Sequence, residues 1–551
     1  MKIEITWKGG GCTKEYDEPI TVLEIVEEFK GEYPRDIMAC YIDHEINRLD
    51  AVIEKDCKLD LLDVTTKSAY KIYQSSLQML YIKAVHDVLG EDVHVSIDNA
   101  LSKGIYTTIR TGGITKNTAA RIEHRMHELV EMKLPFQLRT VSRKEAIAIL
   151  NERNLVSKVR VIENLPEVDN FEIYSLGKEW EVTANKLVLN TSQLKHFEVR
   201  RYKNGMLLRT ALPSHPDGIP PYEEQKQLYS IFAEESRWDR IMGVHYASDL
   251  NDRMIRNDYK DLVLLSEALH EKRISEIATE ITKQKKRIIL IAGPSSSGKT
   301  TFSNRLMIQM RVNGLRPLYL GTDDYFVNRE DTPIGPDGEK NFEDLEAIDV
   351  KLFDQQMNDL LAGKKVDIPT FDFIEGKKIF GTRITSIDAS QPIVIEGIHG
   401  LNPALTKLID DAEKYKIYIS PLTQLNIDEH NRISTTDARM LRRVVRDHQF
   451  RGRNPRQTIN EWRKVRDGED KNIFPYNEQA DTFFNSHCLY ELAVLKKYAT
   501  PLLEEIRQEE KEYPEAQRML KFLSFFVEMP DDSIIPNNSI MREFIGGSIL
   551  A

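Results

Sequence analysis

The sequence predicts a multidomain α/β protein with a parallel sheet in its C-terminal half. Between residue 287 and about residue 505, strand-like segments (RIILIAG, RPLYLGTD, QPIVIEG and KIYIS) alternate with helical segments. This order predicts parallel βαβ units whose ligand-binding residues follow the carboxyl ends of the strands. The chain of 551 residues is too long for one hydrophobic core, so we expect several domains.

The first of these strands runs into a glycine-rich loop typical of phosphate binding. Residues 293–300 read GPSSSGKT, which fits the pattern G-x-x-x-x-G-K-[ST]. We expect its backbone N–H groups to bind phosphate oxygens, Lys299 to add a positive charge and Thr300 to bind Mg²⁺. The loop therefore predicts a site for a nucleoside triphosphate and Mg²⁺. We expect this nucleotide to be ATP, and GTP stays open. The residues expected to contact ATP are Gly293, Ser295, Ser296, Ser297, Gly298, Lys299, Thr300 and Thr301.

The N-terminal 202 residues predict two smaller domains. In residues 1–65, a strand-like segment (MKIEITW) precedes a helical stretch (TVLEIVEEFKGEYP) and further short strands. This order resembles the TGS domain, a β-grasp module. Residues 66–202 resemble the second N-terminal domain of threonyl-tRNA synthetases, an α+β domain that hydrolyses mischarged tRNA. The segments that carry this resemblance are VHVSIDNALSKGIYTTI, RIEHRMHELVEMKLPFQLRTVSRKEA and NTSQLKHFEV.

The residues of the synthetase editing site are replaced in this chain. The H-x-x-x-H pair of that family falls on Gln74 and Gln78, and its C-x-x-x-H pair falls on Thr183 and Leu187. We therefore expect no editing activity. The remaining scaffold is compatible with binding a nucleotide, an RNA end or another protein, or with a regulatory role.

Three further regions complete the predicted organisation. Residues 203–285 predict a helical connector, because proline-rich segments are followed by helical periodicity. Residues 286–510 hold the predicted P-loop domain. Residues 511–551 predict an amphipathic helix and a polar tail without catalytic residues.

A second motif follows the strand that ends in YLGT. Asp323, Asp324, Tyr325 and Phe326 resemble the [ST]-x-D-x-[FY]-[FY] element of the uridine kinase and phosphoribulokinase family. The resemblance implies that Asp323 accepts the proton of the substrate hydroxyl, while Asp324 supports a water on Mg²⁺ or the same hydroxyl. A carboxylate suits this role, since phosphoryl transfer needs an oriented and partly deprotonated nucleophile. An aspartate that caps a helix is the alternative interpretation.

Four more segments match the same family in order: NFEDLEAID (341–349), IPTFDFIEGKK (368–378), IVIEGIHGLN (393–402) and RRVVRDHQFRGR (442–453). The third segment implies that Glu396 supports Mg²⁺. The fourth resembles a lid whose arginines close over the transferring phosphoryl group. The catalytic set that the resemblance implies is Asp323, Lys299, Arg443, Arg446, Arg451 and Arg453. The residues expected to contact the acceptor substrate are Asp324, Tyr325, Phe326, Phe371 and Phe373.

These motifs imply an ATP-dependent nucleoside kinase that transfers the γ-phosphoryl group to a nucleoside 5′-hydroxyl. The base contacts depart from the family pattern, because the His and Arg of its THSR segment fall on Gly376 and Lys378. A changed preference follows, since unpaired polar groups discriminate strongly between substrates. Two alternatives stay open: a kinase of another small alcohol such as a sugar phosphate, and an RNA-associated protein in which ATP acts as a switch.

Composition restricts the expected partners and location. The net charge of −11 argues against a protein that coats nucleic acid, although RNA contact through the N-terminal domains and homo-oligomer assembly stay open. The four cysteines have no zinc-ligand spacing and predict reduced thiols. We find no run of about 18 apolar residues and no signal segment. We therefore expect a cytoplasmic enzyme with a small-molecule substrate and no membrane association.

Overall fold

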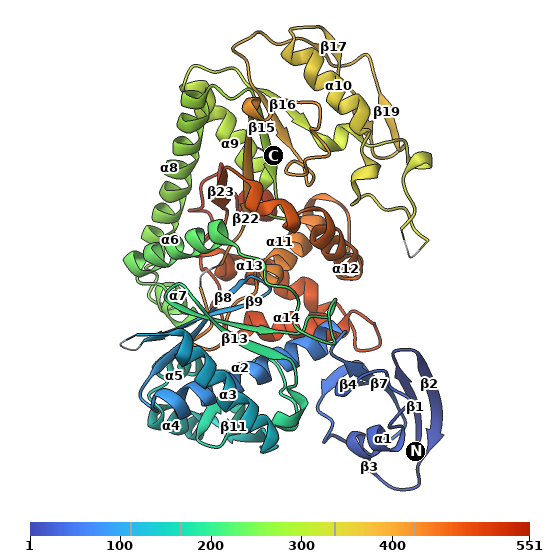
Figure 1. Cartoon of the computed structure of the whole chain (residues 1–551), viewed down its shortest axis with the longest axis vertical. Helices are drawn as coiled ribbons and strands as arrows, with labels where there is room; N and C mark the ends of the chain where they lie inside the picture. The colour runs from blue at the N-terminus through green and yellow to red at the C-terminus, as the bar shows by residue number, and fades with distance from the viewer. Residues whose placement is uncertain (111–112, 166–167, 336–337, 424, 551) are drawn as a thin grey trace.

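The computed structural model describes residues 1–110, 113–165, 168–335, 338–423 and 425–550. The parallel sheet lies in the upper half of Figure 1, and the N-terminal sheets lie in the lower half. Mixed α/β architecture with a parallel C-terminal sheet confirms the predicted fold class.

The N-terminal region forms a five-stranded sheet with the order β2-β1-β7-β4-β5, covered by one short helix. β1 and β7 are parallel, while the other neighbours are antiparallel. The helix begins at Thr21 with a capping box, in which the Thr21 and Glu24 side chains each accept the other's backbone N–H. The elements are β1 (Lys2–Trp7), β2 (Gly10–Glu15), β3 (Ile20–Thr21), α1 (Val22–Glu28), β4 (Ile37–Ile42), β5 (Glu45–Asn47), β6 (Val52–Ile53) and β7 (Cys57–Asp63).

The next region packs two long helices on a four-stranded antiparallel sheet with the order β13-β14-β9-β8. A second sheet, β10-β11-β12, carries two shorter helices. The elements are α2 (Lys67–Leu89), β8 (His94–Leu101), β9 (Gly104–Arg110), α3 (Lys116–Glu131), β10 (Gln137–Ser142), α4 (Arg143–Glu152), α5 (Val156–Glu163), β11 (Asn170–Leu176), β12 (Glu179–Glu181), β13 (Phe197–Tyr202) and β14 (Gly205–Thr210).

The expected domain boundary at residue 202 cuts through a β-hairpin. β13 and β14 pair along their whole length, from Phe197 with Thr210 to Tyr202 with Gly205. β14 also pairs with β9, so it belongs to the preceding sheet. The connector prediction was wrong for this segment, because a short apolar run followed by prolines resembles a linker when its partner strand is unknown. Helices follow at α6 (Lys226–Met242), α7 (Ala247–Ile255) and α8 (Lys260–Gln284).

The parallel sheet of the P-loop region has the order β16-β21-β15-β22-β23. β15 is buried at every residue and lies between β21 and β22. Glu396 of β21 lies in register with Ile291 of β15 and Gly321 of β16, so three neighbouring strands end at one edge. The elements are β15 (Ile288–Ala292), α9 (Lys299–Val312), β16 (Leu318–Gly321), α10 (Val350–Leu361), β21 (Ile393–Glu396), β22 (Lys414–Ser420), α11 (Thr435–Phe450), α12 (Pro455–Asn472) and β23 (Thr482–Asn485).

Two small hairpin-like pairs lie between α10 and β21. β17 (Val366–Asp367) pairs with β20 (Ile384–Thr385), and β18 (Thr370–Asp372) pairs with β19 (Lys377–Ile379). They extend from the parallel sheet at the upper right of Figure 1.

The C-terminal residues are integrated into the core of the P-loop region. Three helices follow the sheet: α13 (Glu491–Glu504), α14 (Tyr513–Ser524) and α15 (Arg542–Ile545). Ile540, Met541 and Phe544 are completely buried in the same core as α11 and α13. The expected polar tail was therefore wrong for this segment, whose apolar residues show too short a periodic pattern to indicate burial. Among the described helices, none is both long and apolar enough to span a bilayer.

Candidate active site

The glycine-rich loop lies between the end of β15 and the first turn of α9. Gly298 precedes α9 in the left-handed region, with φ of 84°. A Cβ on Gly293 would lie 2.0 Å from the carbonyl oxygen of Ile419, so only glycine fits. The backbone between them folds tightly enough for successive N–H groups to face one ligand.

Two serine hydroxyls of this loop have no hydrogen-bond partner in the part of the chain that the structure describes. The Oγ atoms of Ser296 and Ser297 are buried and form no hydrogen bond among the described residues. Buried polar atoms without partners are rare, because their desolvation is costly. Together with the free end of α9, they fit a phosphate chain that supplies acceptor oxygens.

Lys299 folds back over the loop. Its Nζ donates to the carbonyl oxygens of Gly293 and Pro294, at 3.1 and 3.3 Å. These neutral carbonyl oxygens are weaker acceptors for an ammonium group than a charged phosphate oxygen is. A bound phosphate would therefore replace them as the partner of Lys299. The positive charge of the loop is therefore available to an anion.

Oxygen ligands of the kind that Mg²⁺ prefers meet beside the loop. The Thr300 hydroxyl donates to Oε2 of Glu396 at 3.1 Å, and the Tyr319 hydroxyl donates to the same oxygen at 2.8 Å. Glu396 ends β21, and Thr300 is the second residue of α9. A hydroxyl and a carboxylate at this position fit a hard divalent cation.

Asp323 lies two residues after the end of β16 and beside these groups. Its side chain is open to solvent, although many protein atoms crowd around it. This desolvation, reinforced by repulsion from Glu396 and Asp324, raises the pKa of Asp323 to about 6, while Lys299 and Arg451 oppose the rise. A carboxylate with this pKa is suited to accept a proton near neutral pH.

The two residues after Asp323 point elsewhere. Asp324 accepts a hydrogen bond from Arg383 at 2.6 Å, so that guanidinium neutralises it. Tyr325 is completely buried, and its hydroxyl donates to Gln356 at 2.8 Å. The prediction that Tyr325 contacts the acceptor is wrong, because the 3-10 turn over Thr322–Tyr325 directs that ring into the core.

An aromatic cluster lies next in the chain. Phe326 packs edge-to-face against Phe371 and Phe342, with ring centroids 5.6 and 6.0 Å apart. Phe373 lies 5.2 Å from Phe371 and is 61% exposed. Three of these residues were predicted. Phe342 was not named, although the NFEDLEAID segment that contains it had been recognised.

Glu343, beside Phe342, is a further acid of the site that was not named from the sequence. Burial raises its pKa to about 7, opposed chiefly by the attraction of Arg443. Smaller effects of Lys299 and Asp323 show that it faces the same group of charges. Its position within the recognised segment was the available signal.

Asp447 holds three of the four predicted arginines together. This completely buried residue of α11 pairs with Arg446 at 3.0 Å, Arg443 at 3.2 Å and Arg451 at 3.6 Å. Arg443 also reaches the loop, since its Nη1 donates to Ser295 Oγ at 2.9 Å. The side chain of Arg451 is 52% exposed, yet desolvation by the surrounding protein atoms, followed by repulsion from Arg446, lowers its pKa to about 10. Arg453 pairs with Glu461, which also lies 3.8 Å from Arg443, so this arginine lies at the edge of the same cluster.

Two residues that sequence reasoning missed also contact the loop. Arg439 Nε donates to the Ser295 carbonyl at 2.9 Å, and Glu469 accepts from the Ser295 N–H at 2.8 Å. Arg439 and Glu469 form a buried ion pair. Arg439 lies one turn before Arg443 on α11, which was the available signal, whereas α12 carried none.

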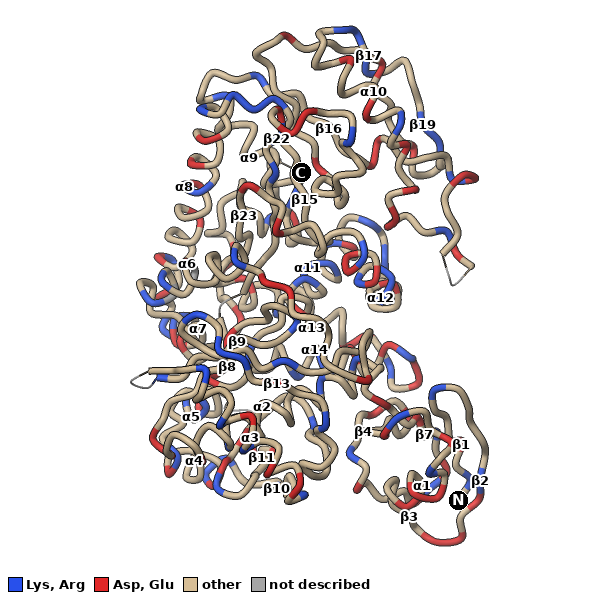
Figure 2. The backbone as a smooth tube through the Cα atoms, viewed as in Figure 1, with Lys and Arg blue, Asp and Glu red and all other residues tan. Residues whose placement is uncertain are grey.

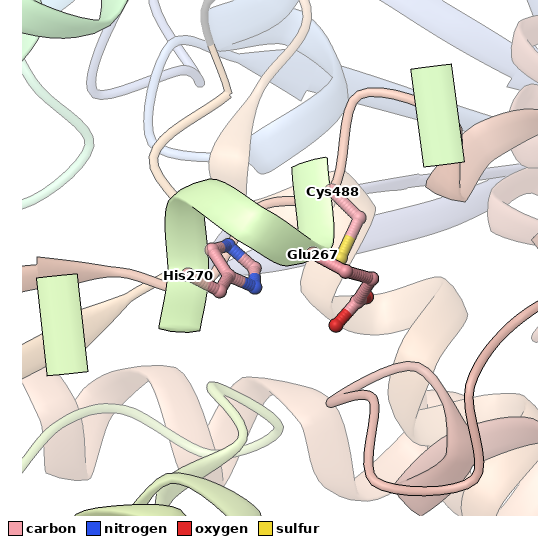
Figure 3. A group of neighbouring side chains, drawn as sticks. All are labelled: Glu267, His270 and Cys488. Carbon is pink, nitrogen blue, oxygen red and sulfur yellow. The ribbon is translucent and has the colours of Figure 1, made fainter. Parts of the chain in front are cut away.

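A second cluster of titratable groups lies apart from these residues. Glu267, His270 and Cys488 lie together, with one potential ligand atom of each within 4.8 Å of the others (Figure 3). Glu267 already accepts from Tyr490 at 2.8 Å and Ser539 at 2.6 Å. Burial raises the pKa of Cys488 well above its ordinary value, which keeps the thiol protonated. We interpret the cluster as structural contacts that anchor the C-terminal segment.

The positions of the lost editing residues come together in the N-terminal region. Gln74 and Gln78 lie on α2, and the segment with Thr183 and Leu187 packs against this helix. Asn185 donates to Ser75 at 3.0 Å, and the Val188 N–H donates to Ser76 at 3.0 Å.

The fold and this arrangement are those of a P-loop nucleotide-binding domain. The model of the "Phosphoribulokinase / Uridine kinase family" matches residues 288–492. The uridine kinase of Ligilactobacillus salivarius is 30% identical over 179 residues, which cover 32% of this chain and 74% of that protein. The chain belongs to the phosphoribulokinase/uridine kinase family.

The N-terminal region matches a different group of proteins. The threonine–tRNA ligase of Syntrophomonas wolfei is 27% identical over 233 residues, which cover 39% of this chain and 36% of that ligase. The chain spans about a third of the length of the ligases that it matches. Such a combination is consistent with a fusion of the two.

A solved structure described as a possible uridine kinase from Bacillus stearothermophilus has a TM-score of 0.27 and 21% identity, and covers 39% of this chain and 97% of that one.

Proposed function

We propose that the chain is an ATP-dependent nucleoside kinase that transfers the γ-phosphoryl group of ATP to a nucleoside 5′-hydroxyl. The observation that carries this proposal is the position of Asp323, whose pKa is raised to about 6 beside Lys299. It also lies three residues before the aromatic cluster, in the turn that ends β16. A base, a phosphate loop and an apolar acceptor surface are thereby adjacent.

Each step of the transfer has a candidate group. The N–H groups of the loop and the Lys299 ammonium bind the phosphates, while Arg443 extends from α11 to Ser295. The acceptor oxygen attacks the γ-phosphorus as the bond to the β-phosphate oxygen breaks, and its proton passes to Asp323. Positive charge on Arg443, Arg446 and Arg451 stabilises the negative charge that spreads over the transferring group.

Mg²⁺ fits the oxygen ligands of Thr300 and Glu396. When bound, it neutralises charge on the β- and γ-phosphates. Glu396 also repels Asp323, so this residue contributes to the raised pKa of the base.

The acceptor surface is suited to a flat apolar group but offers few specific hydrogen bonds to it. Phe326, Phe371 and Phe373 supply aromatic faces and edges suited to a nucleobase. Lys378, at the position of the family's arginine, is held by Asp349. Gly376 packs against Arg329, where a Cβ would lie 2.6 Å from that side chain. The base donors of the family are therefore absent from these two positions.

This absence supports a second candidate, a kinase of another small alcohol such as a sugar phosphate. One panel separates the two. The chain is incubated with Mg-ATP and single acceptors from both classes, and ADP and the phosphorylated product are measured. We expect a nucleoside 5′-monophosphate, and a loss of about 100-fold or more in Lys299→Ala. Lys283→Ala, on the exposed part of α8, is the matched control. Transfer to sugar phosphates far above that to any nucleoside would replace the first proposal with the second.

A third candidate, an RNA-associated protein switched by ATP, is supported by the match to threonine–tRNA ligases. Figure 2 shows basic and acidic stretches interspersed over the N-terminal domains, which gives this candidate no electrostatic support. Salt-sensitive tRNA binding without any phosphorylated small product would favour it.

A further inference from the structure

The C-terminal segment, residues 531–550, places a carboxylate on the phosphate loop. Oε2 of Glu543 accepts the backbone N–H of Thr301 at 3.2 Å and the Thr301 hydroxyl at 2.7 Å. Thr301 is the third residue of α9, so its N–H has no partner within the helix. This donor belongs to the set that binds an anion at a helix N-terminus.

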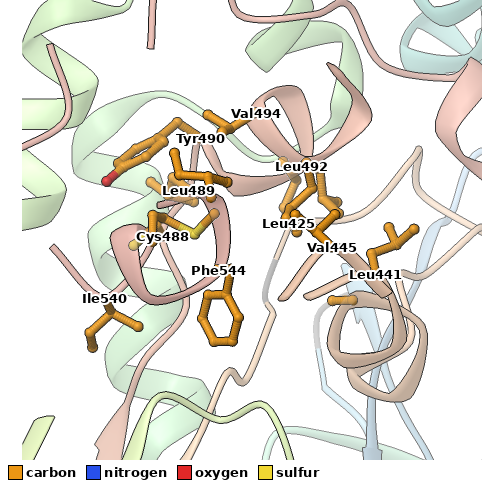
Figure 4. Close-up of a cluster of buried hydrophobic side chains, with 14 of the residues drawn as sticks. Leu425, Leu441, Val445, Cys488, Leu489, Tyr490, Leu492, Val494, Ile540 and Phe544 are labelled. Carbon is orange, nitrogen blue, oxygen red and sulfur yellow. The ribbon is translucent and has the colours of Figure 1, made fainter. Parts of the chain in front are cut away.

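Neighbouring contacts hold Glu543 in this position. Ile540 lies against the loop, since a Cβ on Gly298 would be 2.6 Å from its Cγ2. Asn304, one turn further along α9, donates to the carbonyl oxygen of Leu550 at 2.8 Å. Figure 4 shows Ile540 and Phe544 among the buried side chains of the core around Cys488 and Tyr490. The segment is therefore a built contact and not a loose end.

Among the described residues Glu543 has no ion-pair partner, unlike the other carboxylate on the loop. Glu469, which accepts the Ser295 N–H, is paired with Arg439 and Arg466. Within the described part of the chain, no ion pair involves Glu543, and it is only half-buried. A phosphate chain on the same amides would meet this negative charge at close range, and like charges repel.

We infer that Glu543 is an autoinhibitory stand-in for a phosphate: it occupies an amide of the ATP cradle, and ATP binds only as this carboxylate leaves Thr301. The inference rests on the proposed function only in that the loop holds ATP. It adds that nucleotide affinity is set by the C-terminal segment. A segment that merely supports the fold would have the opposite effect, since its loss would weaken ATP binding.

The test compares the affinity for Mg-ATP of the full chain, Glu543→Gln and Asp531→Asn by isothermal titration calorimetry. Asp531 is an exposed acid of the same segment without a contact to the loop, so it controls for charge alone. We expect Glu543→Gln to bind ATP about fivefold or more tightly, as for a coupling of ordinary size, and Asp531→Asn to bind as the unchanged chain does. Affinity in Glu543→Gln that is equal or lower would overturn the inference.

A second measurement needs no variant. Hydrogen exchange of the unchanged chain should show faster exchange over residues 542–550 when ATP is added, because the contact to Thr301 is lost. Slower exchange there would overturn the inference even if the variants failed to fold. The proposed function is tested separately. If Glu543→Gln binds ATP more tightly but no acceptor is phosphorylated, the autoinhibitory role of Glu543 stands and the nucleoside kinase assignment is wrong.

Discussion

Lys71 of α2 is ion-paired with Asp437 of α11, with Nζ 3.0 Å from Oδ2. Arg518 of α14 binds the same carboxylate through both of its terminal nitrogens, at 2.9 Å each. The pair joins the synthetase-like region to the first turn of the helix that carries Arg443 and Arg446. The N-terminal region is thereby fixed to the helix that reaches the phosphate loop.

The first prediction concerns this link. The pKa of Asp437 lies far below its ordinary value: the attraction of Arg518 and Lys71 exceeds the opposing effect of burial. Burial, with repulsion from Arg518, lowers the pKa of Lys71 to about 8 despite the attraction of Asp437. Asp437→Asn should leave Lys71 without its ion-pair partner and Arg518 with Glu515 alone, and reduce the free energy of unfolding by about 3 kcal/mol. Denaturant unfolding measures this.

The pH dependence of that effect has a defined sign. The folded-state pKa of Asp437 is depressed, so its contribution is present above the ordinary pKa of 3.8 and is lost as the pH falls below it. The unchanged chain and Asp437→Asn should therefore converge in stability in acid. A difference between them that stays constant from pH 7 down to strongly acidic pH would contradict the role of this carboxylate.

A second prediction concerns Asp447, which acts through the arginines that it holds. Asp447→Asn weakens three ion pairs at once while leaving a side chain of the same size. We expect kcat to fall about 100-fold, as when one stabilising group of a transition state is lost, with little change in the affinity for ATP. Single-turnover kinetics and ATP titration check the two expectations. An equal loss of ATP affinity would show that Asp447 supports the binding of the ground state.

The third prediction is the pH profile of the reaction. Only ionised Asp323 can accept a proton, and its pKa is raised to about 6. The value of kcat/KM should therefore increase with pH and level off above an apparent pKa of about 6. Glu396→Gln removes the largest repulsive charge and should move this limb to lower pH, whatever it does to the rate. A limb that does not move would show that another group titrates.

Local patterns revealed the parts of the site that depend on the order of elements alone. The ends of β15, β16 and β21 could be predicted, because parallel strands place Gly293, Asp323 and Glu396 at one edge. The burial of Tyr325 could not be predicted, because a shift of one residue in a 3-10 turn decides whether a ring faces the core. Glu543 is 242 residues from its partner Thr301, and a contact at such a separation leaves no pattern in one sequence.

The fourth prediction follows from the same raised pKa of Asp323. Its folded-state pKa exceeds the ordinary value of 3.8, so ionisation at pH 7 opposes folding, and this cost is relieved as the pH falls through about 6. Asp323→Asn should therefore be inactive and yet have a higher melting temperature at pH 7 than the unchanged chain. The gain should vanish at pH 4 in a thermal melt. A lower melting temperature at pH 7 would mean that the ionised carboxylate stabilises the fold.

The last prediction separates acceptor binding from fold stability at the aromatic cluster. Phe373 is 61% exposed and contacts Phe371 and Phe326 through its ring. Phe373→Ala should raise KM for the acceptor about tenfold, the effect of losing roughly 1.4 kcal/mol of aromatic contact, while KM for ATP stays unchanged. The neighbouring Ile374 is 85% exposed and has no part in the ring contacts, so Ile374→Ala is the matched control. Because both positions are exposed, denaturation midpoints should change little. Equal effects of the two substitutions on the acceptor would show that the cluster does not bind it, whereas an effect confined to Phe373 would place the base of the acceptor against this ring.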